Sequence, residues 1–299
     1  MTLREALSSG AFVVTVEAAP PKGTAVEGVL AEAEKLRGRV QAFNVTDQQS
    51  SVMRLGSLAL CHLLAERGLE PVYQVTCRDR NRIALQSDLL SAAALGIENV
   101  LCLTGDHVSM GDHPQAKPVF DLDAVTLLQA ARALMEGHDL AGKELAGAPR
   151  FFLGAVVSPC AEPLEPQIFK MEKKVRAGAA FFQTQAIFDL GRYAAFHEAT
   201  RGMGVPVLAG LVMLKSAKMA RFMNQNVPGV FVPGALIAEM EAAKDARERE
   251  RASVEITARL IRGLRGLAAG IHIMAMGWDH LIPRVLEAAG LQQQPVEAA

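Results

Sequence analysis

The chain has 299 residues, a length that can bury a substantial core and suits one large α/β unit or two modest domains. Lysine and arginine (31) nearly balance aspartate and glutamate (32), and the formal net charge of −1 leaves no basic surplus for binding nucleic acid or an anionic membrane. Aromatic residues make up only 5% of the chain, which also disfavours a base-stacking surface.

Short β-rich segments alternate with helical segments along the whole chain. The expected strands cover residues 11–16, 41–46, 71–76, 99–103, 151–157, 181–185, 207–213 and 271–275. The expected helices cover residues 26–36, 52–66, 80–95, 124–135, 167–177, 190–200, 217–225, 235–267 and 280–289. The charged helical segment at about 235–267 is highly charged from Glu239 to Arg251, and its run Lys244–Arg251, which mixes both signs, predicts an exposed helix surface. A tail at about 291–299 is expected to be frayed.

Strand–helix units in series, without an obvious linker, predict a single (β/α)₈ barrel of the TIM type over residues 1–299. A doubly wound open sheet would produce the same alternation, so the pattern alone does not exclude it. The sequence lacks both the Gly-x-Gly-x-x-Gly and the Gly-x-x-x-x-Gly-Lys-Ser/Thr motifs of nucleotide-binding sheets. Both absences favour the barrel.

The cysteines indicate the compartment. They lie far apart without paired spacing, at Cys61, Cys77, Cys102 and Cys160. This pattern disfavours a zinc or iron–sulfur site and a disulfide framework, and it fits a reducing cytoplasm. The first residues lack the apolar block of a secretion signal, and no uncharged apolar run reaches the ~18 residues that a membrane span needs. We expect a cytoplasmic protein without a metal or a membrane span.

Polar residues lie at or directly after the carboxyl ends of most of the predicted strands, where the active site of a barrel is found. They are Glu17, Asn44, Thr46, Asp47, Gln74, Thr76, Thr104, Gly105, Asp106, Ser158, Gln183, Gln185 and His272. Gln183 and Gln185 are two residues apart in one strand, so both side chains can face one pocket. Glu17 is flanked by Val16 and by alanines and prolines at 18–21, and such an apolar setting raises a carboxyl pKa and favours the protonated acid.

Each of these residues also has an ordinary structural explanation. Glu17 could be a solvated loop residue, Asp106 a helix cap or turn residue, and His272 a core histidine. The two glutamines of the sixth strand could bond backbone groups at the rim. His107 and His113 flank a loop and could be metal ligands, but no supporting cluster accompanies them in the sequence.

Several segments carry motifs that recur together in one enzyme family. They are Val-Glu-Ala-Ala-Pro-Pro-Lys at 16–22, Phe-Asn-Val-Thr at 43–46, Val-Thr-Cys at 75–77, Leu-Thr-Gly-Asp at 103–106, Lys-Lys-Val-x-Ala-Gly-Ala at 173–179, Gln-Thr-Gln-Ala-Ile-Phe-Asp at 183–189, Pro-Gly-Val-Phe-Val-Pro at 228–233 and Gly-Ile-His-Ile-Met at 270–274. In order and spacing the chain resembles the methylenetetrahydrofolate reductase family, in the variety found in acetogenic and related anaerobic bacteria.

The resemblance implies a flavin-containing barrel that reduces 5,10-methylenetetrahydrofolate to 5-methyltetrahydrofolate by hydride transfer from reduced flavin. It implies that Glu17 is the general acid, protonating the departing nitrogen as the methylene bridge opens to an iminium ion. It implies that Asp106 is also catalytic, its negative charge stabilising the developing cation. The implied substrate contacts are Gln183, Gln185 and Phe222 or Met223, and the implied flavin contacts are Thr46, Gln74, Thr104, Gly105, Asp106, Ser158 and Lys174.

The sequence departs from the family pattern where the flavin would be held. Gln74 stands where the well-known bacterial branch has a histidine, Thr104 where it has an arginine, and Gly154 where it has an aromatic residue. Ser158 and Gln167 replace a histidine and an acid. These changes weaken the binding of an adenine dinucleotide, so the expected cofactor is FMN or a more loosely bound FAD, and a flavin-free relative stays open as an alternative. NADH is the expected electron donor, with a partner protein as the alternative.

Two other classes of function stay open. One is a barrel with different chemistry, such as an aldolase or a folate-binding methyltransferase, for which Lys215 is the nearest Schiff-base candidate. The other is a non-catalytic folate-binding subunit that works with an electron-transfer or zinc-containing partner. Retention of Glu17, Asp106 and Gln185 at one mouth argues against a pure scaffold. A homo-oligomer is compatible with the sequence.

Overall fold

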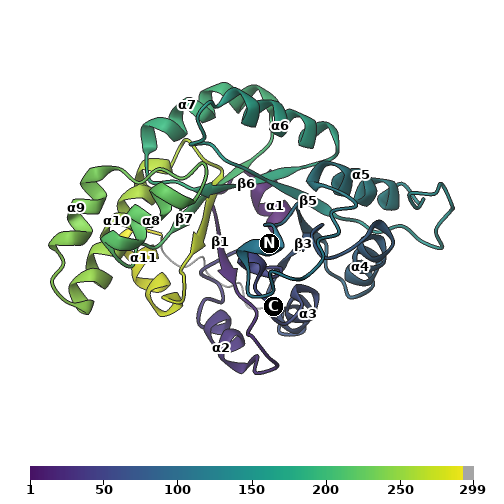
Figure 1. Cartoon of the computed structure of the whole chain (residues 1–299), viewed down its shortest axis with the longest axis horizontal. Helices are drawn as coiled ribbons and strands as arrows, with labels where there is room; N and C mark the ends of the chain where they lie inside the picture. The colour runs from purple at the N-terminus through teal and green to yellow at the C-terminus, as the bar shows by residue number, and fades with distance from the viewer. Residues whose placement is uncertain (292–299) are drawn as a thin grey trace.

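The computed structural model describes residues 1–291 and forms a closed barrel in which every strand is parallel to its sequence neighbours and β8 pairs with β1 (Figure 1). The strands are β1 (Val13–Ala18), β2 (Ala42–Val45), β3 (Pro71–Thr76), β4 (Asn99–Leu103), β5 (Phe152–Val157), β6 (Phe181–Ala186), β7 (Val207–Val212) and β8 (Gly270–Met274). The predicted (β/α)₈ barrel is confirmed, and the open sheet is excluded. Apart from Leu291, the predicted frayed tail lies outside the described residues.

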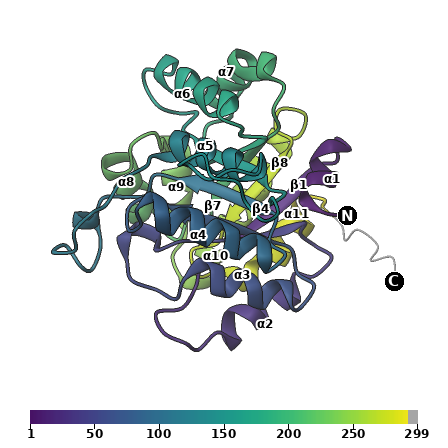
Figure 2. The same ribbon diagram turned by 90° about the vertical axis from the view of Figure 1, so that its right-hand side faces the viewer.

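Helices surround the barrel (Figures 1 and 2). They are α1 (Leu3–Ser8), α2 (Glu27–Lys35), α3 (Ser57–Ala65), α4 (Arg82–Ala94), α5 (Ala124–Met135), α6 (Glu165–Arg176), α7 (Leu190–Thr200), α8 (Ala217–Asn226), α9 (Gly234–Ala242), α10 (Ala246–Leu264) and α11 (Ile282–Ala288). Several begin at a residue whose side chain accepts a hydrogen bond from the first turn, among them Asn81, Asp123, Asp189 and Ser216. Within residues 1–291, no helix is both long enough and apolar enough to cross a membrane.

The charged segment at about 235–267 forms two helices, which corrects the prediction of a single helical region. α9 ends at Ala242, and α10 begins after Asp245, whose carboxylate accepts a hydrogen bond from the backbone N–H of Glu248. α10 packs against α11, α9, α7 and β7, and α9 also packs against α8. The seventh strand–helix unit is therefore an extended one, with α10 as its outer wall.

The short helix α1, which the sequence pattern did not reveal, closes the amino-terminal end of the barrel. Its Leu3, Ala6 and Leu7 are buried against inward-facing residues of the strands, Val13, Ala42, Val72, Leu101, Phe152, Phe181 and Leu208. The backbone N–H of Leu3 also donates to the Glu70 carboxylate at 2.8 Å. In Figure 2, α1 lies at one end of the barrel. The apolar plug leaves the carboxyl ends of the strands as the open end.

Candidate active site

A cavity of about 300 Å³ lies at the carboxyl ends of the strands. We call it the mouth cavity. Its lining includes Glu17, Thr46, Asp47, Gln48, Gln49, Gln74, Thr76, Arg78, Thr104, Gly105, Asp106, Val156, Gln183, Gln185 and Met274. The structure thus brings together the two predicted catalytic acids, both glutamines of β6 and five of the seven predicted flavin contacts, Asp106 being counted in both groups.

Four predicted site residues do not line this cavity. Lys174 on α6 donates its amine to the carbonyl of Val156 at 2.6 Å, and burial lowers its pKa. Ser158 is half-buried and lies against the loop that follows α8. On α8, Met223 is buried in the core, while Phe222 is 58% exposed. Their substrate and cofactor roles remain predictions.

Glu17 projects from the inner face of β1 and is held by an amide. Gln49 donates its Nε2 to both carboxylate oxygens of Glu17 at 3.3 Å. Burial raises the pKa of Glu17 to about 7, against the lowering effect of the Gln49 hydrogen bond; the negative charge of Asp279 raises it further, and Arg54 lowers it. A carboxyl group with this pKa is partly protonated at neutral pH and can act as a general acid.

This raised pKa predicts a pH-dependent stability. The folded state holds the Glu17 proton more tightly than the unfolded chain, whose value is near 4.5, so stability falls as pH rises from about 4.5 to about 7. Glu17→Gln has no proton to lose at this position, so the variant lacks this fall in stability. The free energy of unfolding of the variant minus that of the wild type should therefore be higher at pH 8 than at pH 4, by on the order of 3 kcal/mol. Urea denaturation at both pH values measures this difference, and an equal effect of the substitution at the two pH values would contradict the raised pKa.

A layer of buried polar side chains lies inside the barrel, on the inner faces of the strands. Gln74 donates its Nε2 to Asn44 Oδ1 at 2.8 Å, and Asn44 in turn donates to Gln183 Oε1. Thr15 Oγ1 and His272 Nδ1 are 3.0 Å apart, and burial lowers the pKa of His272 to about 3, so its imidazole is neutral. The amide chain fixes Gln183, which lines the mouth cavity.

Arg78, which the sequence analysis did not single out, connects the two sides of the mouth cavity. Its side chain is 3% exposed. Its guanidinium donates to the backbone carbonyl of Asp106 at 3.2 Å and to that of Gln48 at 3.4 Å. The signal in the sequence was Arg78-Asp79-Arg80, a run of charges directly after a buried strand. Arg78 thereby ties the loop that carries Gln49 to the loop that carries Asp106.

The loop after β2 has an unusual backbone. Gln48, Ser50 and Ser51 have φ values of 49°, 54° and 61°, in the left-handed region that residues other than glycine rarely adopt. Gly111, from the loop after β4, packs so closely that a Cβ there would lie 1.8 Å from the Ser51 carbonyl oxygen. Asp112 accepts a hydrogen bond at 3.0 Å from the backbone of the same β2 loop. The strained loop is held from the opposite side of the mouth cavity.

Asp47 joins the ends of β2 and β3 through a buried ion pair. Its side chain is fully buried and accepts hydrogen bonds from the Thr76 backbone N–H and hydroxyl, both at 2.9 Å. Arg80 completes the pair with two further hydrogen bonds, at 2.7 and 3.1 Å. This arrangement fixes the base of the mouth cavity and satisfies both carboxylate oxygens.

The donor set at the mouth cavity fits the ring of a flavin. Thr46 Oγ1 is buried and, among the described residues, has no hydrogen-bond partner. Gly105 has a φ of +91°, and a Cβ there would lie 3.0 Å from Thr76 Cβ, so only glycine lets the backbone line the cavity at this point. Gln74 and Gln185 offer both amide donors and acceptors, which suit the mixed polar edge of the ring. Within residues 1–291, no cluster of histidine, cysteine and acidic side chains is arranged to hold a metal ion.

Comparison with known proteins assigns the family. The sequence model described as methylenetetrahydrofolate reductase matches residues 2–290. The chain belongs to the methylenetetrahydrofolate reductase family. The family predicted from the motifs is therefore confirmed.

Curated members of the methylenetetrahydrofolate reductase family differ from this chain in length. "Methylenetetrahydrofolate reductase 2" of Schizosaccharomyces pombe is 24% identical over 248 residues, which are 79% of this chain but 38% of that protein. "5,10-methylenetetrahydrofolate reductase" of Pectobacterium carotovorum is 26% identical over 240 residues, 75% of each chain. The chain thus spans little more than a third of the yeast relative and three quarters of the bacterial one.

Solved structures share the fold of this methylenetetrahydrofolate reductase family member. One is a protein from Clostridium thermocellum described as binding two copies of 5-methyl-5,6,7,8-tetrahydrofolic acid. It superposes with a TM-score of 0.62 at 14% identity and covers 98% of both chains. A 2,3-dimethylmalate lyase gives a TM-score of 0.51 at 14% identity over 95% of this chain and 82% of its own. At such identities the likeness shows the barrel fold alone.

Proposed function

We propose that this protein reduces 5,10-methylenetetrahydrofolate to 5-methyltetrahydrofolate with electrons from a bound flavin. The observation that carries the proposal is the position of Glu17, an acid with a pKa of about 7 that shares one cavity with Asp106 and Gln185. Membership of the methylenetetrahydrofolate reductase family supports the reaction class. We further propose NADH as the electron donor. NADPH is the alternative, because a Caenorhabditis elegans relative is named "Probable methylenetetrahydrofolate reductase (NADPH)".

The residues of the mouth cavity have distinct roles in this proposal. Glu17 protonates the departing nitrogen of the methylene bridge, which opens to a cationic iminium. Asp106, an exposed residue on the cavity wall, stabilises that cation with its carboxylate, and Arg78 holds the Asp106 backbone in place. Gln185 at the rim and Gln183 beneath it hydrogen-bond the pterin ring. Once the charge is in place, the substrate carbon is ready to accept a hydride.

When bound, the flavin supplies that hydride. Thr46, Gln74, Thr104 and Gly105 would hold its ring at the mouth cavity. FAD and FMN share this ring, and the difference between them lies beyond the phosphate. Since Lys174 and Ser158 do not line the mouth cavity, the grip on the phosphate end is weaker than the grip on the ring.

The first test is the absorption spectrum of the purified protein, which should show the bands of an oxidised flavin. Mass spectrometry of the released cofactor then distinguishes FMN from FAD. Under anaerobic conditions NADH should bleach these bands, and 5,10-methylenetetrahydrofolate should restore them with formation of 5-methyltetrahydrofolate. A protein that binds neither flavin yet binds 5-methyltetrahydrofolate would overturn the reductase proposal.

That last outcome would favour the second candidate, a non-catalytic folate-binding barrel that works with an electron-transfer partner. The observation in its favour is that the amine of Lys174 is already bonded to a strand carbonyl. An aldolase-like function has less support, because the Lys215 amine lies 5.3 Å from the centre of the Trp278 ring and does not line the mouth cavity. The reductase and the non-catalytic folate-binding barrel share the folate site, and they differ in whether a flavin is bound.

A further inference from the structure

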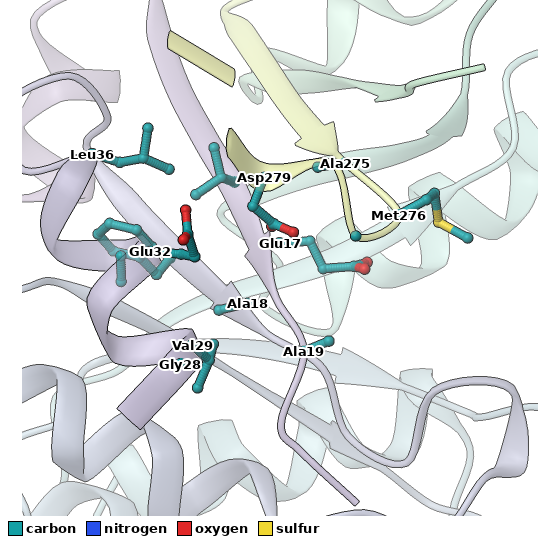
Figure 3. A pocket seen from close by; sticks show the side chains of 14 residues that line it. Glu17, Ala18, Ala19, Gly28, Val29, Glu32, Leu36, Ala275, Met276 and Asp279 are labelled. Atoms are coloured by element: carbon teal, nitrogen blue, oxygen red, sulfur yellow. The ribbon is translucent and has the colours of Figure 1, made fainter. Parts of the chain in front are cut away.

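A second cavity, of about 260 Å³, lies beside the first strand (Figure 3). We call it the side cavity. It is enclosed by β1, α2 and the loop after β8. Its walls are mainly apolar, and its polar groups are three carboxyls, those of Glu17, Glu32 and Asp279. The proposed reaction uses only the first of these three.

Glu17 lines both the side cavity and the mouth cavity. Its carboxyl group can therefore be approached from two directions. In the proposed function the folate occupies the mouth cavity and covers Glu17 from that side. The side cavity reaches the same carboxyl from behind, between β1 and α2.

The other two carboxyls line the same side cavity as Glu17. Asp279 begins the short helical turn η4 (Asp279–Leu281) and is half-buried, and its carboxylate has no hydrogen bond or ion pair with the part of the chain that the structure describes. Glu32 on α2 has a side chain that is 37% exposed and paired with Lys35 at 2.7 Å. In Figure 3 the side chain of Asp279 lies between those of Glu32 and Glu17. Asp279 also acts electrostatically on Glu17, so a proton route through this cavity would run from Glu32 through Asp279 to Glu17.

Resting on the function proposed above, we propose that the side cavity is the route by which Glu17 exchanges its proton with solvent while the mouth cavity is filled. In each turnover Glu17 gives one proton to the departing nitrogen and regains one from solvent. A cavity of about 260 Å³ can hold several water molecules, each of which takes about 30 Å³ in the liquid. Water near Glu32 passes a proton to Asp279, and Asp279 passes one to Glu17. Asp279 is a positioning residue in this scheme, because it acts on the reaction only through Glu17.

Other groups also face Glu17 and must be kept constant in any test. Gln49 donates to its carboxylate from the loop after β2, and the positive charge of Arg54 acts on it from the same loop. Asp106 and Arg78 line the mouth cavity with it. A substitution at Asp279 changes the charge near Glu17 as well as the route, so the rate of proton exchange has to be measured apart from the pKa.

The experiment follows the protonation of Glu17 directly, without turnover. The protein is saturated with 5-methyltetrahydrofolate, the pH is jumped, and the carboxyl band of Glu17 is followed by infrared spectroscopy, with Glu17→Gln identifying the band. We expect rapid exchange in the wild type, exchange slowed at least tenfold in Asp279→Asn, and rapid exchange restored in Asp279→Glu. Ala33→Leu, which fills the side cavity from α2, should also slow exchange. The control Ala94→Leu, in a groove beside α4, should not.

Two results would overturn the inference while leaving the proposed function in place. Wild-type protein whose Glu17 stops exchanging once 5-methyltetrahydrofolate is bound would show that the mouth is the entrance for protons. Unchanged exchange in both Asp279→Asn and Ala33→Leu would place the route elsewhere. Failure to bind 5-methyltetrahydrofolate would instead overturn the proposed function and this inference with it. Because Ala33→Leu leaves every carboxyl in place, the test does not depend on the folding of the Asp279 variants.

Discussion

Glu17→Gln should lower the rate of 5,10-methylenetetrahydrofolate reduction by about 100- to 10,000-fold, the usual contribution of a general acid. Glutamine keeps the size of the side chain but has no proton to give to the departing nitrogen. Reduction of the flavin by its donor requires no such proton and should stay close to the wild-type rate. Stopped-flow absorbance resolves the two half-reactions, because the flavin bleaches in the first and recovers its colour in the second.

The pH dependence of the folate half-reaction gives the same prediction a second test. In the wild type the rate should be highest below about pH 7 and fall above it, as Glu17 loses its proton. The residual rate of Glu17→Gln should not show this fall above about pH 7. Glu70→Gln is a matched control, because burial also raises the pKa of Glu70, which bonds α1 at the opposite end of the barrel. If Glu17→Gln left both half-reactions unaltered, the assignment of the acid would be wrong.

Asp47→Ala should lower the free energy of unfolding by about 2–3 kcal/mol, because it breaks a buried ion pair and leaves a buried donor unsatisfied. The substitution removes one of the two carboxylates that pair with the Arg80 guanidinium, whose side chain is 19% exposed; the other, Asp88 at 2.9 Å, stays in place. It also leaves the buried Thr76 backbone N–H without an acceptor. Urea denaturation at neutral pH measures the loss.

Asp121→Ala is the control for this experiment. Asp121 also receives two hydrogen bonds from a guanidinium, that of Arg82, at 2.8 and 2.9 Å, and one from the Arg82 backbone N–H at 2.8 Å, but the Arg82 side chain is 55% exposed. Water can replace the lost partner there, so we expect a much smaller loss of stability. Equal losses in the two variants would show that burial does not set the strength of the Asp47–Arg80 pair.

The barrel could be predicted because its strands are covered on both faces. Parallel strands buried in this way appear as short, nearly continuous apolar runs, and β4 and β7 are of this kind. The break between α9 and α10 could not be seen in the charge pattern, since charged residues run across it; Asp245 was the available signal. α1 was missed because a helix of 6 residues leaves too little periodicity to detect.

The residues of the mouth cavity also fall into those that could be predicted from the sequence and those that could not. Residues that sit on strands, such as Glu17 and Gln185, could be placed at one end of the barrel because strand direction determines where they point. Gln49 and Arg78 could not, since their positions depend on how two loops distant in sequence pack against each other. The contact of Gly111 with Ser51 that holds these loops leaves no trace in local sequence. Asp279 was missed because its position, too, depends on how a loop packs against distant parts of the chain.

The plug formed by α1 determines at which end of the barrel ligands can enter and leave. Because Leu3 and Leu7 close the far end, a folate and a nicotinamide that bind as proposed above would both have to enter at the carboxyl ends of the strands. Two bulky reactants that share one opening would then have to bind one after the other. Steady-state plots at several fixed concentrations of either reactant would accordingly be parallel lines.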